Sequence, residues 1–317
     1  MKEIIYMHAL NEARHEEMSR DPKVFIMGED IHNTKELVDA FGIERVRGCP
    51  ISESAFSGAA VGAAAMGYRP IVWLMFGTFV YVAMDQIVNQ AAKLRYMTGG
   101  QVKLPIVYWV PIGSGFNAGA QHSDHPLALL GNSPGLKIVL PSTPYDAKGL
   151  LKAAIRDDNP VIFFEEQMLG MTSGEIPDED YIVPIGKGDI KREGSDVTVV
   201  AIGSMVPRAL TASRKLQRDG ISVEVVDPRS LVPLDKDLIL ESVKKTGRLI
   251  VLEDAPPICS FASEISAVVA EYGFSLIKSP ILRVTRHNVP VPFSPSLENA
   301  VLPNEKMLIN AVTKIMQ

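Results

Sequence analysis

The chain has 317 residues, of which 46% are hydrophobic, and a formal net charge of −5. Its length predicts two domains, and its apolar content is sufficient for a core in each. The negative charge and the lack of a long basic segment argue against nucleic acid as a partner. The sequence contains no run of about 18 apolar residues, so we expect no membrane span.

Cysteine usage and the first residues bear on where the protein works. Cys49 and Cys259 stand alone, without the spacing of a metal site, which is typical of thiols in a reducing cytosol. The first residues lack the apolar core and the cleavage site of a signal peptide. We therefore expect a soluble, cytoplasmic protein.

In chain order, helical periodicity predicts a helix over residues 6–19 and then a short strand over 24–27. A helix of small residues follows, from 54 to 67. Later segments alternate between the two types, with strands expected at 70–76, 104–109, 137–140 and 161–164, and helices at 80–96 and 144–156. Such alternation is typical of a parallel sheet with helices on both faces.

The apolar periodicity lapses around residues 172–193, where we place an inter-domain linker at 173–190. The first domain is then 1–172 and the second is 191–317. Alternation resumes there, with strands expected at 197–202, 223–226, 249–252 and 281–284, and helices at 207–218, 235–244 and 261–271. The sequence thus predicts two α/β domains, the second smaller than the first.

The most informative short motif is residues 50–53, Pro-Ile-Ser-Glu, directly before the helix of small residues. Ser52 is a candidate N-cap, and the helix macrodipole favours an acid such as Glu53 in the first turn. Gly58 and Gly62 lie four residues apart on one helical face, which permits close packing. The motif alone fits either a functional acid or a capped, tightly packed helix whose first-turn Glu is solvated.

A glycine-rich loop at 113–119 follows a predicted strand and leads to His122 and His125. Its glycine spacing misses the dinucleotide-binding pattern by one residue, and the two histidines do not have the usual zinc spacing. A His at the carboxyl end of a parallel strand is well placed for proton transfer. A structural or merely exposed His is the alternative.

Two further segments have both an ordinary and a functional interpretation. Met75 and Phe79 would normally be core residues, but they could also form a flat apolar surface for an aromatic ring. Residues 154–160 read as the end of a helix, where free carbonyl groups could also hold a monovalent cation. No motif that grips a diphosphate is present in the sequence.

Together these motifs resemble, almost from end to end, the beta subunit of the thiamine-diphosphate-dependent decarboxylating component of 2-oxoacid dehydrogenase complexes. The segments that carry the resemblance are 28–30, 50–53, 85–87, 95–100, 121–123, 134–137, 146–150, 154–160, 226–231 and 233–235. Residues 52–56 and 291–295 look most like the acetoin dehydrogenase branch. The resemblance implies a transketolase-like pyrimidine-binding domain followed by a transketolase C-terminal domain that chiefly serves assembly.

The resemblance also implies partners and cofactors. In this family the catalytic site is shared: an alpha subunit holds magnesium and the diphosphate, and the beta subunit covers the aminopyrimidine ring of thiamine diphosphate. We therefore expect a heterotetramer of two alpha and two beta subunits. A lipoyl acyltransferase is the expected acceptor of the acyl group.

Site residues follow from the resemblance by position. Glu53 would hydrogen-bond the pyrimidine nitrogen, Met75 and Phe79 would line the pyrimidine pocket, and His122 would face the substrate. A structural potassium ion is implied at Ile106, Ala154, Ile155, Asp157 and Asn159.

Three departures from the family pattern stand out. The chain is about ten residues shorter than relatives between Asp30 and Phe41, Asp124 stands where relatives usually carry Gln, and Trp73 stands where many carry Glu. Two alternatives stay open: the departure beside His122 is the main support for the first, and the presence of Glu53 and His122 argues against the second. One is a carboligase of the same fold that uses no lipoyl partner, and the other is a non-catalytic assembly subunit.

Overall fold

The computed structural model describes residues 1–317, apart from the side chains of residues 32 and 33. The chain forms two units. The first consists of Met1–Ile112 and Leu129–Ile185, and the second of Gly113–Ala128 and Gly186–Gln317. Each unit is built on a sheet of mostly parallel strands, as the alternating pattern predicts.

The first unit has a parallel sheet in the order β6-β7-β5-β4-β2-β3. Its strands are β2 (Val24–Gly28), β3 (Val46–Gly48), β4 (Arg69–Trp73), β5 (Val107–Ile112), β6 (Lys137–Val139) and β7 (Val161–Glu166). A separate antiparallel pair joins β1 (Lys2–Ile5) to β8 (Ser173–Ile176).

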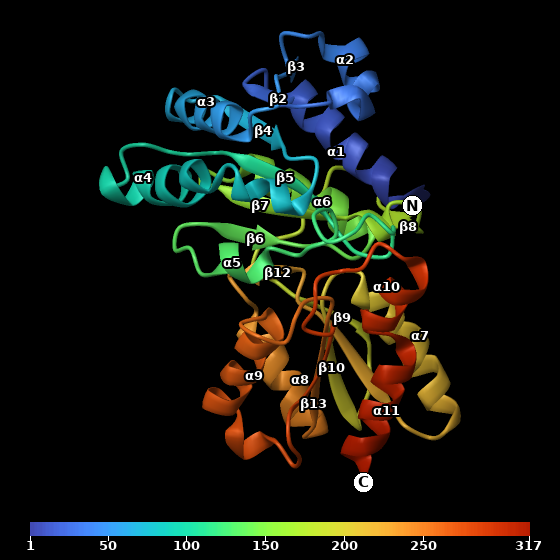
Figure 1. Ribbon diagram of the computed structural model, residues 1–317. Coiled ribbons are helices and arrows are strands. Elements are labelled where there is room, and N and C mark those ends of the chain that lie inside the picture. Colours follow the sequence, from blue (N-terminus) through green and yellow to red (C-terminus); the bar gives the residue numbers. More distant parts are fainter. The chain divides into compact units, whose positions relative to one another are not determined.

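Helices cover both faces of this sheet (Figure 1). They are α1 (Tyr6–Arg20), α2 (Lys35–Phe41), α3 (Glu53–Ala65), α4 (Ala92–Met97), α5 (Leu127–Gly131), which begins in the second unit, and α6 (Pro144–Arg156). The short 3-10 segments are Ile31–Thr34, Gly77–Tyr81 and Gln167–Leu169. Apolar residues of α1 and α6 share one core with alternate residues of the strands, and α3 packs on the opposite face, against β2 and β4.

Two tryptophans pair across neighbouring strands of this sheet. The rings of Trp73 and Trp109 lie 4.0 Å apart, and the guanidinium of Arg14 lies 3.6 Å from the centre of the Trp109 ring. The Trp109 indole donates a hydrogen bond to Glu165. Burial lowers the pKa of Arg14 to about 10, against the opposing effect of the Glu165 charge. Trp73 therefore belongs to a buried aromatic cluster under α1.

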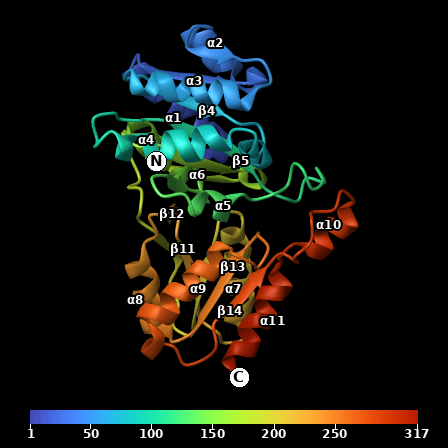
Figure 2. The same cartoon turned by 60° about the vertical axis from the view of Figure 1, so that its left-hand side comes forward.

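The second unit has a sheet in the order β14-β13-β10-β11-β9, parallel except for β9. The strands of this sheet are β9 (Asp189–Arg192), β10 (Val197–Ala201), β11 (Val223–Asp227), β13 (Leu249–Glu253) and β14 (Leu282–Thr285). The short strand β12 (Ser230–Val232) is not part of this sheet. Its helices are α7 (Met205–Arg218), α8 (Lys236–Thr246), α9 (Phe261–Tyr272), α10 (Pro295–Val301) and α11 (Glu305–Met316), with a 3-10 turn at Phe274–Leu276. Figure 2 shows α8 and α9 on one face of this sheet and α7 with α11 on the other.

The sequence prediction of a helix at 80–96 differs from the structure. There the chain forms the 3-10 segment Gly77–Tyr81, then a π-helix over Asp85–Ala91, and only then α4. Periodicity does not distinguish these helix types, because each keeps apolar residues on one side. Among the described residues, none of the helices has the length and apolar character needed to cross a membrane.

Candidate active-site residues in two units

Glu53 is the first residue of α3 and is only 6% exposed. Ser52 occupies the N-cap position, but its hydroxyl makes no capping bond in the part of the chain that the structure describes. Among the described residues Glu53 forms no ion pair with a basic side chain, although the helix macrodipole favours a negative charge there. A buried carboxyl without a basic partner is costly in a merely structural role, and this favours a functional one.

Glu29 is a second buried acid next to Glu53. It directly follows β2, at the carboxyl end of the sheet, and is 3% exposed. Burial raises the pKa of Glu29, and the charges of Glu53 and Asp30 raise it further. In the sequence, Glu29 stands out only as part of the family motif at residues 28–30. Its position directly after a buried parallel strand is the signal that could have identified it.

Buried polar atoms near α3 lack protein partners. Among the described residues they include Glu29 Oε2, Ser57 Oγ and Gln86 Oε1. Ser57 belongs to α3, and the Gln86 side chain packs against α3 at Gly58. Since buried polar groups normally find a hydrogen-bond partner, these atoms suit a ligand that carries both donors and acceptors.

Met75 and Phe79 lie where the sequence predicts them, just past the carboxyl end of β4. Met75 is half-buried and packs on the core of the first unit. Phe79 is in the 3-10 segment Gly77–Tyr81, and its ring lies edge-on to Phe76 at 5.4 Å. Half-buried apolar groups at this edge of the sheet offer a surface on which an aromatic ring can pack.

His122 belongs to the second unit, in the loop Gly113–Ala128. It is half-buried, and its backbone N–H donates to the carbonyl of Gly119 at 3.2 Å. Burial opposes ionisation of the neighbouring Asp124, but hydrogen bonds and charge from Arg286 outweigh it and lower the pKa of Asp124. Glu53 and His122 are therefore held by different units.

The five residues expected to hold potassium lie around the carboxyl end of α6, in the first unit. The carbonyl oxygens of Ile155 and Asp157 accept hydrogen bonds from Arg69 at 2.9 and 3.0 Å. The Asn159 side-chain oxygen accepts from Arg95 at 2.6 Å.

Two more of these oxygens, on Ile106 and Ala154, accept bonds from backbone N–H groups at 2.8 and 3.2 Å. Each carbonyl oxygen has a second lone pair, so the donor set is chemically suited to a monovalent cation. The guanidinium of Arg69 already supplies positive charge to two of these oxygens. Whether potassium binds there stays a prediction.

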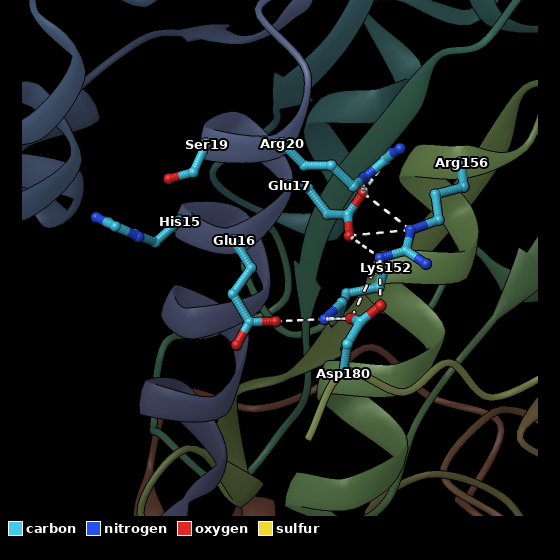
Figure 3. A pocket seen from close by; sticks show the side chains of 8 residues that line it. All are labelled: His15, Glu16, Glu17, Ser19, Arg20, Lys152, Arg156 and Asp180. Carbon is cyan, nitrogen blue, oxygen red and sulfur yellow. Dashed lines mark hydrogen bonds and ion pairs between the residues drawn. The ribbon is translucent and has the colours of Figure 1, made fainter. Parts of the chain in front are cut away.

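A surface cavity of about 460 Å³ lies between α1 and α6 (Figure 3). Its charged walls pair with one another: Glu17 binds Arg20 and Arg156, and Lys152 bridges Glu16 and Asp180. None of the catalytic, cofactor-binding or potassium-binding residues predicted from the sequence lines this cavity. Because these charges are already paired, the cavity provides little that would favour a charged ligand.

Comparison with known proteins identifies the family. The transketolase pyrimidine-binding domain matches residues 2–172, and the transketolase C-terminal domain matches residues 186–308. The beta subunit of acetoin:2,6-dichlorophenolindophenol oxidoreductase from Bacillus subtilis is 46% identical over 97% of this chain and 96% of its own length. The chain belongs to the family of transketolase-type dehydrogenase beta subunits.

Other relatives place the family more broadly. The 2-oxoisovalerate dehydrogenase beta subunit of Bacillus subtilis is 41% identical over all of both chains. The pyruvate dehydrogenase E1 beta subunit of Rickettsia bellii is 44% identical over 99% of this chain and 98% of its own. A solved split-gene transketolase, described as an inactive beta4 tetramer, aligns over 99% of this chain with a TM-score of 0.83 and 25% identity.

These findings confirm the two-domain transketolase-like fold and the assignment to dehydrogenase beta subunits. The individual site residues and the domain boundaries stay predictions.

Proposed function

We propose that this chain is the beta subunit of a thiamine-diphosphate-dependent acetoin or 2-oxoacid dehydrogenase and that it is catalytic only together with an alpha subunit. The observation that carries the proposal is the buried Glu53, which has another acid, Glu29, as its charged neighbour. The acetoin enzyme is the favoured type, because the acetoin relative is 46% identical to this chain, against 41% and 44% for the 2-oxoisovalerate and pyruvate relatives.

Thiamine diphosphate supplies, when bound, a nucleophilic carbon and an electron sink for cleaving a C–C bond next to a carbonyl. Glu53 would share a proton with the nitrogen of its pyrimidine ring, and the raised pKa of Glu29 limits the negative charge beside that bond. Met75 and Phe79 would pack on the pyrimidine ring. His122 would exchange a proton with the oxygen of the substrate carbonyl.

The alpha subunit would hold magnesium and the diphosphate, in an assembly of two alpha and two beta subunits. The acyl group would pass to the lipoyl arm of an acyltransferase. Potassium would bind at the end of α6, around Ile155 and Asp157. Cys49 and Cys259 form no disulfide bond, which supports a location in the reducing cytosol.

The decisive experiment is reduction of an artificial dye by this chain reconstituted with its alpha partner, thiamine diphosphate and magnesium. Acetoin, pyruvate and branched 2-oxo acids would be compared as substrates. Glu53→Gln is expected to lower kcat at least about 100-fold, the scale of a lost proton-transfer group. Glu36→Gln is the matched control, because Glu36 is also a first-turn acid, in α2, but is exposed.

A carboligase of the same fold is the second candidate, because the chain also aligns along nearly its full length with a split-gene transketolase. Acylation of a lipoyl domain separates the two. A dehydrogenase acylates the lipoyl arm, whereas a carboligase leaves it free and releases a ligated product without reducing the dye. Equal activity of wild type and Glu53→Gln in every assay would contradict both and leave an assembly subunit.

A further inference from the structure

The loop Gly113–Ala128, which carries His122, is anchored to the second unit at its first turn. Both carboxylate oxygens of Glu298, on α10, accept backbone hydrogen bonds, from Gly115 at 2.7 Å and from Asn117 at 2.9 Å. Gly115 and Asn117 both have positive φ, +101° and +59°. Gly and Asn adopt this conformation more readily than other residues, and the two bonds to Glu298 fix the turn that they form.

The loop is anchored again immediately after His122. Arg286 donates to the Asp124 carboxylate at 2.9 Å and to the carbonyl of Ser123 at 3.3 Å. Asp254 accepts a hydrogen bond from Ser114 at the start of the loop.

Between these anchors the loop has a further contact. Phe293 lies against Gly119, where a Cβ would come within 3.0 Å of its ring. His122 therefore lies between two charged anchors and directly after a packed turn. Its position along the loop leaves it few residues over which to move independently.

The anchoring side chains are themselves buried. Glu298, Arg286 and Asp254 are each less than 10% exposed. Charged hydrogen bonds in such surroundings are strong, and removing one partner leaves the other buried without a substitute. The loop is therefore held much more firmly than an exposed, glycine-rich segment would be.

We propose that Glu298, Arg286 and Asp254 are positioning residues for His122, so that the second domain takes part in catalysis as well as in assembly. The proposal rests on the proposed function for the role of His122. The anchoring itself is a property of this chain and is measurable without turnover.

The first variant is Glu298→Gln in the full chain, assembled with the alpha subunit. Gln keeps the size of Glu but offers one acceptor oxygen, so one of the two backbone N–H groups loses its partner. Hydrogen exchange of residues 113–128 is expected to become roughly 10- to 100-fold faster. With kcat normalised to active sites, we expect a loss of about tenfold or more, with KM and thiamine diphosphate affinity changed less than about threefold.

Glu224→Gln is the matched control. Glu224 is a buried carboxylate of the same unit that also accepts from a backbone N–H, that of Gly194 at 3.2 Å, but it does not touch the loop. We expect it to leave loop exchange and kcat of the folded complex unchanged. Ser114→Ala is a milder second variant, which removes only the bond to Asp254. It tests the anchoring even if Glu298→Gln does not fold.

Unchanged loop exchange in both loop variants would overturn the proposal, and so would an equal loss of kcat in Glu224→Gln. If the wild-type complex turns over none of the substrates, the proposed function fails. Hydrogen exchange of residues 113–128 alone then decides whether the loop is anchored as proposed. Faster exchange in Glu298→Gln then supports the anchoring, and unchanged exchange refutes it.

Discussion

Replacing Glu253 by Gln is expected to remove a large pH dependence from the stability of the second unit. Glu253 ends β13, is 1% exposed, and accepts hydrogen bonds from the backbone N–H groups of Phe261 and Ala262 at 3.3 and 2.7 Å. Burial raises its pKa from 4.5 to about 7, although these N–H groups and the charge of His125 oppose the shift. Between about pH 4.5 and 7, Glu253 therefore keeps a proton in the folded protein that it has released in the unfolded chain.

The sign and size follow from this difference in pKa. A carboxyl whose pKa is raised by folding contributes stability below pH 4.5, and that contribution is lost as the pH rises to about 7. At 1.36 kcal/mol for each pKa unit, the loss is about 3 kcal/mol. A domain of this size changes its melting temperature by roughly 2–4 °C per kcal/mol, so we expect a relative shift of about 6–12 °C.

Calorimetry of the full chain between pH 5 and 8 measures this effect. Gln mimics the protonated acid, so the Glu253→Gln variant should lose less stability than wild type over this interval. The difference between the two proteins cancels the contributions of all other titrating groups. If the difference in melting temperature between the two proteins is the same at every pH, Glu253 is already ionised in the folded state and the reasoning is refuted.

Three further changes test other features. Lys152→Met should lower the free energy of unfolding by about 1–2 kcal/mol in urea, because its amino group is buried but both carboxylate partners are open to water. Gly135→Ala should lower the free energy of unfolding by more than about 3 kcal/mol, since φ is +103° and the new Cβ would lie 1.9 Å from the Ala92 carbonyl oxygen. Gly62→Ala is the control, because a Cβ there meets free space and should be neutral or stabilising. Expression and melting temperature of the isolated chains compare the two variants. Exchanging Na⁺ for K⁺ at constant ionic strength should raise the melting temperature if Ile155 and Asp157 hold the ion, and identical curves would contradict that site.

The sheet architecture was predictable because its strands are short, β-branched and separated by amphipathic segments. The run 161–164 is an example, and in the structure it forms the first four residues of β7, which lies between β6 and β5. The strands β8 and β9 lie in or beside the polar stretch that the sequence assigns to a linker. They are short, and only their pairing with β1 and β11 stabilises them, so local pattern gave no signal.

The candidate site was predictable only in part. Glu53 is identifiable because a first-turn acid is a local feature. The anchoring of the His122 loop is not, because Glu298 lies 183 residues after Gly115 in the chain. Only tertiary folding brings such positions together, and no spacing rule connects them. Sequence periodicity likewise assigns the loop to the domain that precedes it, whereas its contacts assign it to the second unit.

The tryptophan pair has a practical consequence for spectroscopy. The chain contains two tryptophans, and both lie in the first unit, 4.0 Å apart and beside the guanidinium of Arg14. Intrinsic tryptophan emission will therefore follow the unfolding of the first unit, which carries Glu53, and will not respond to unfolding of the second unit alone. Recording emission together with heat capacity on one sample would assign each transition to its own unit, without a label or a truncated chain.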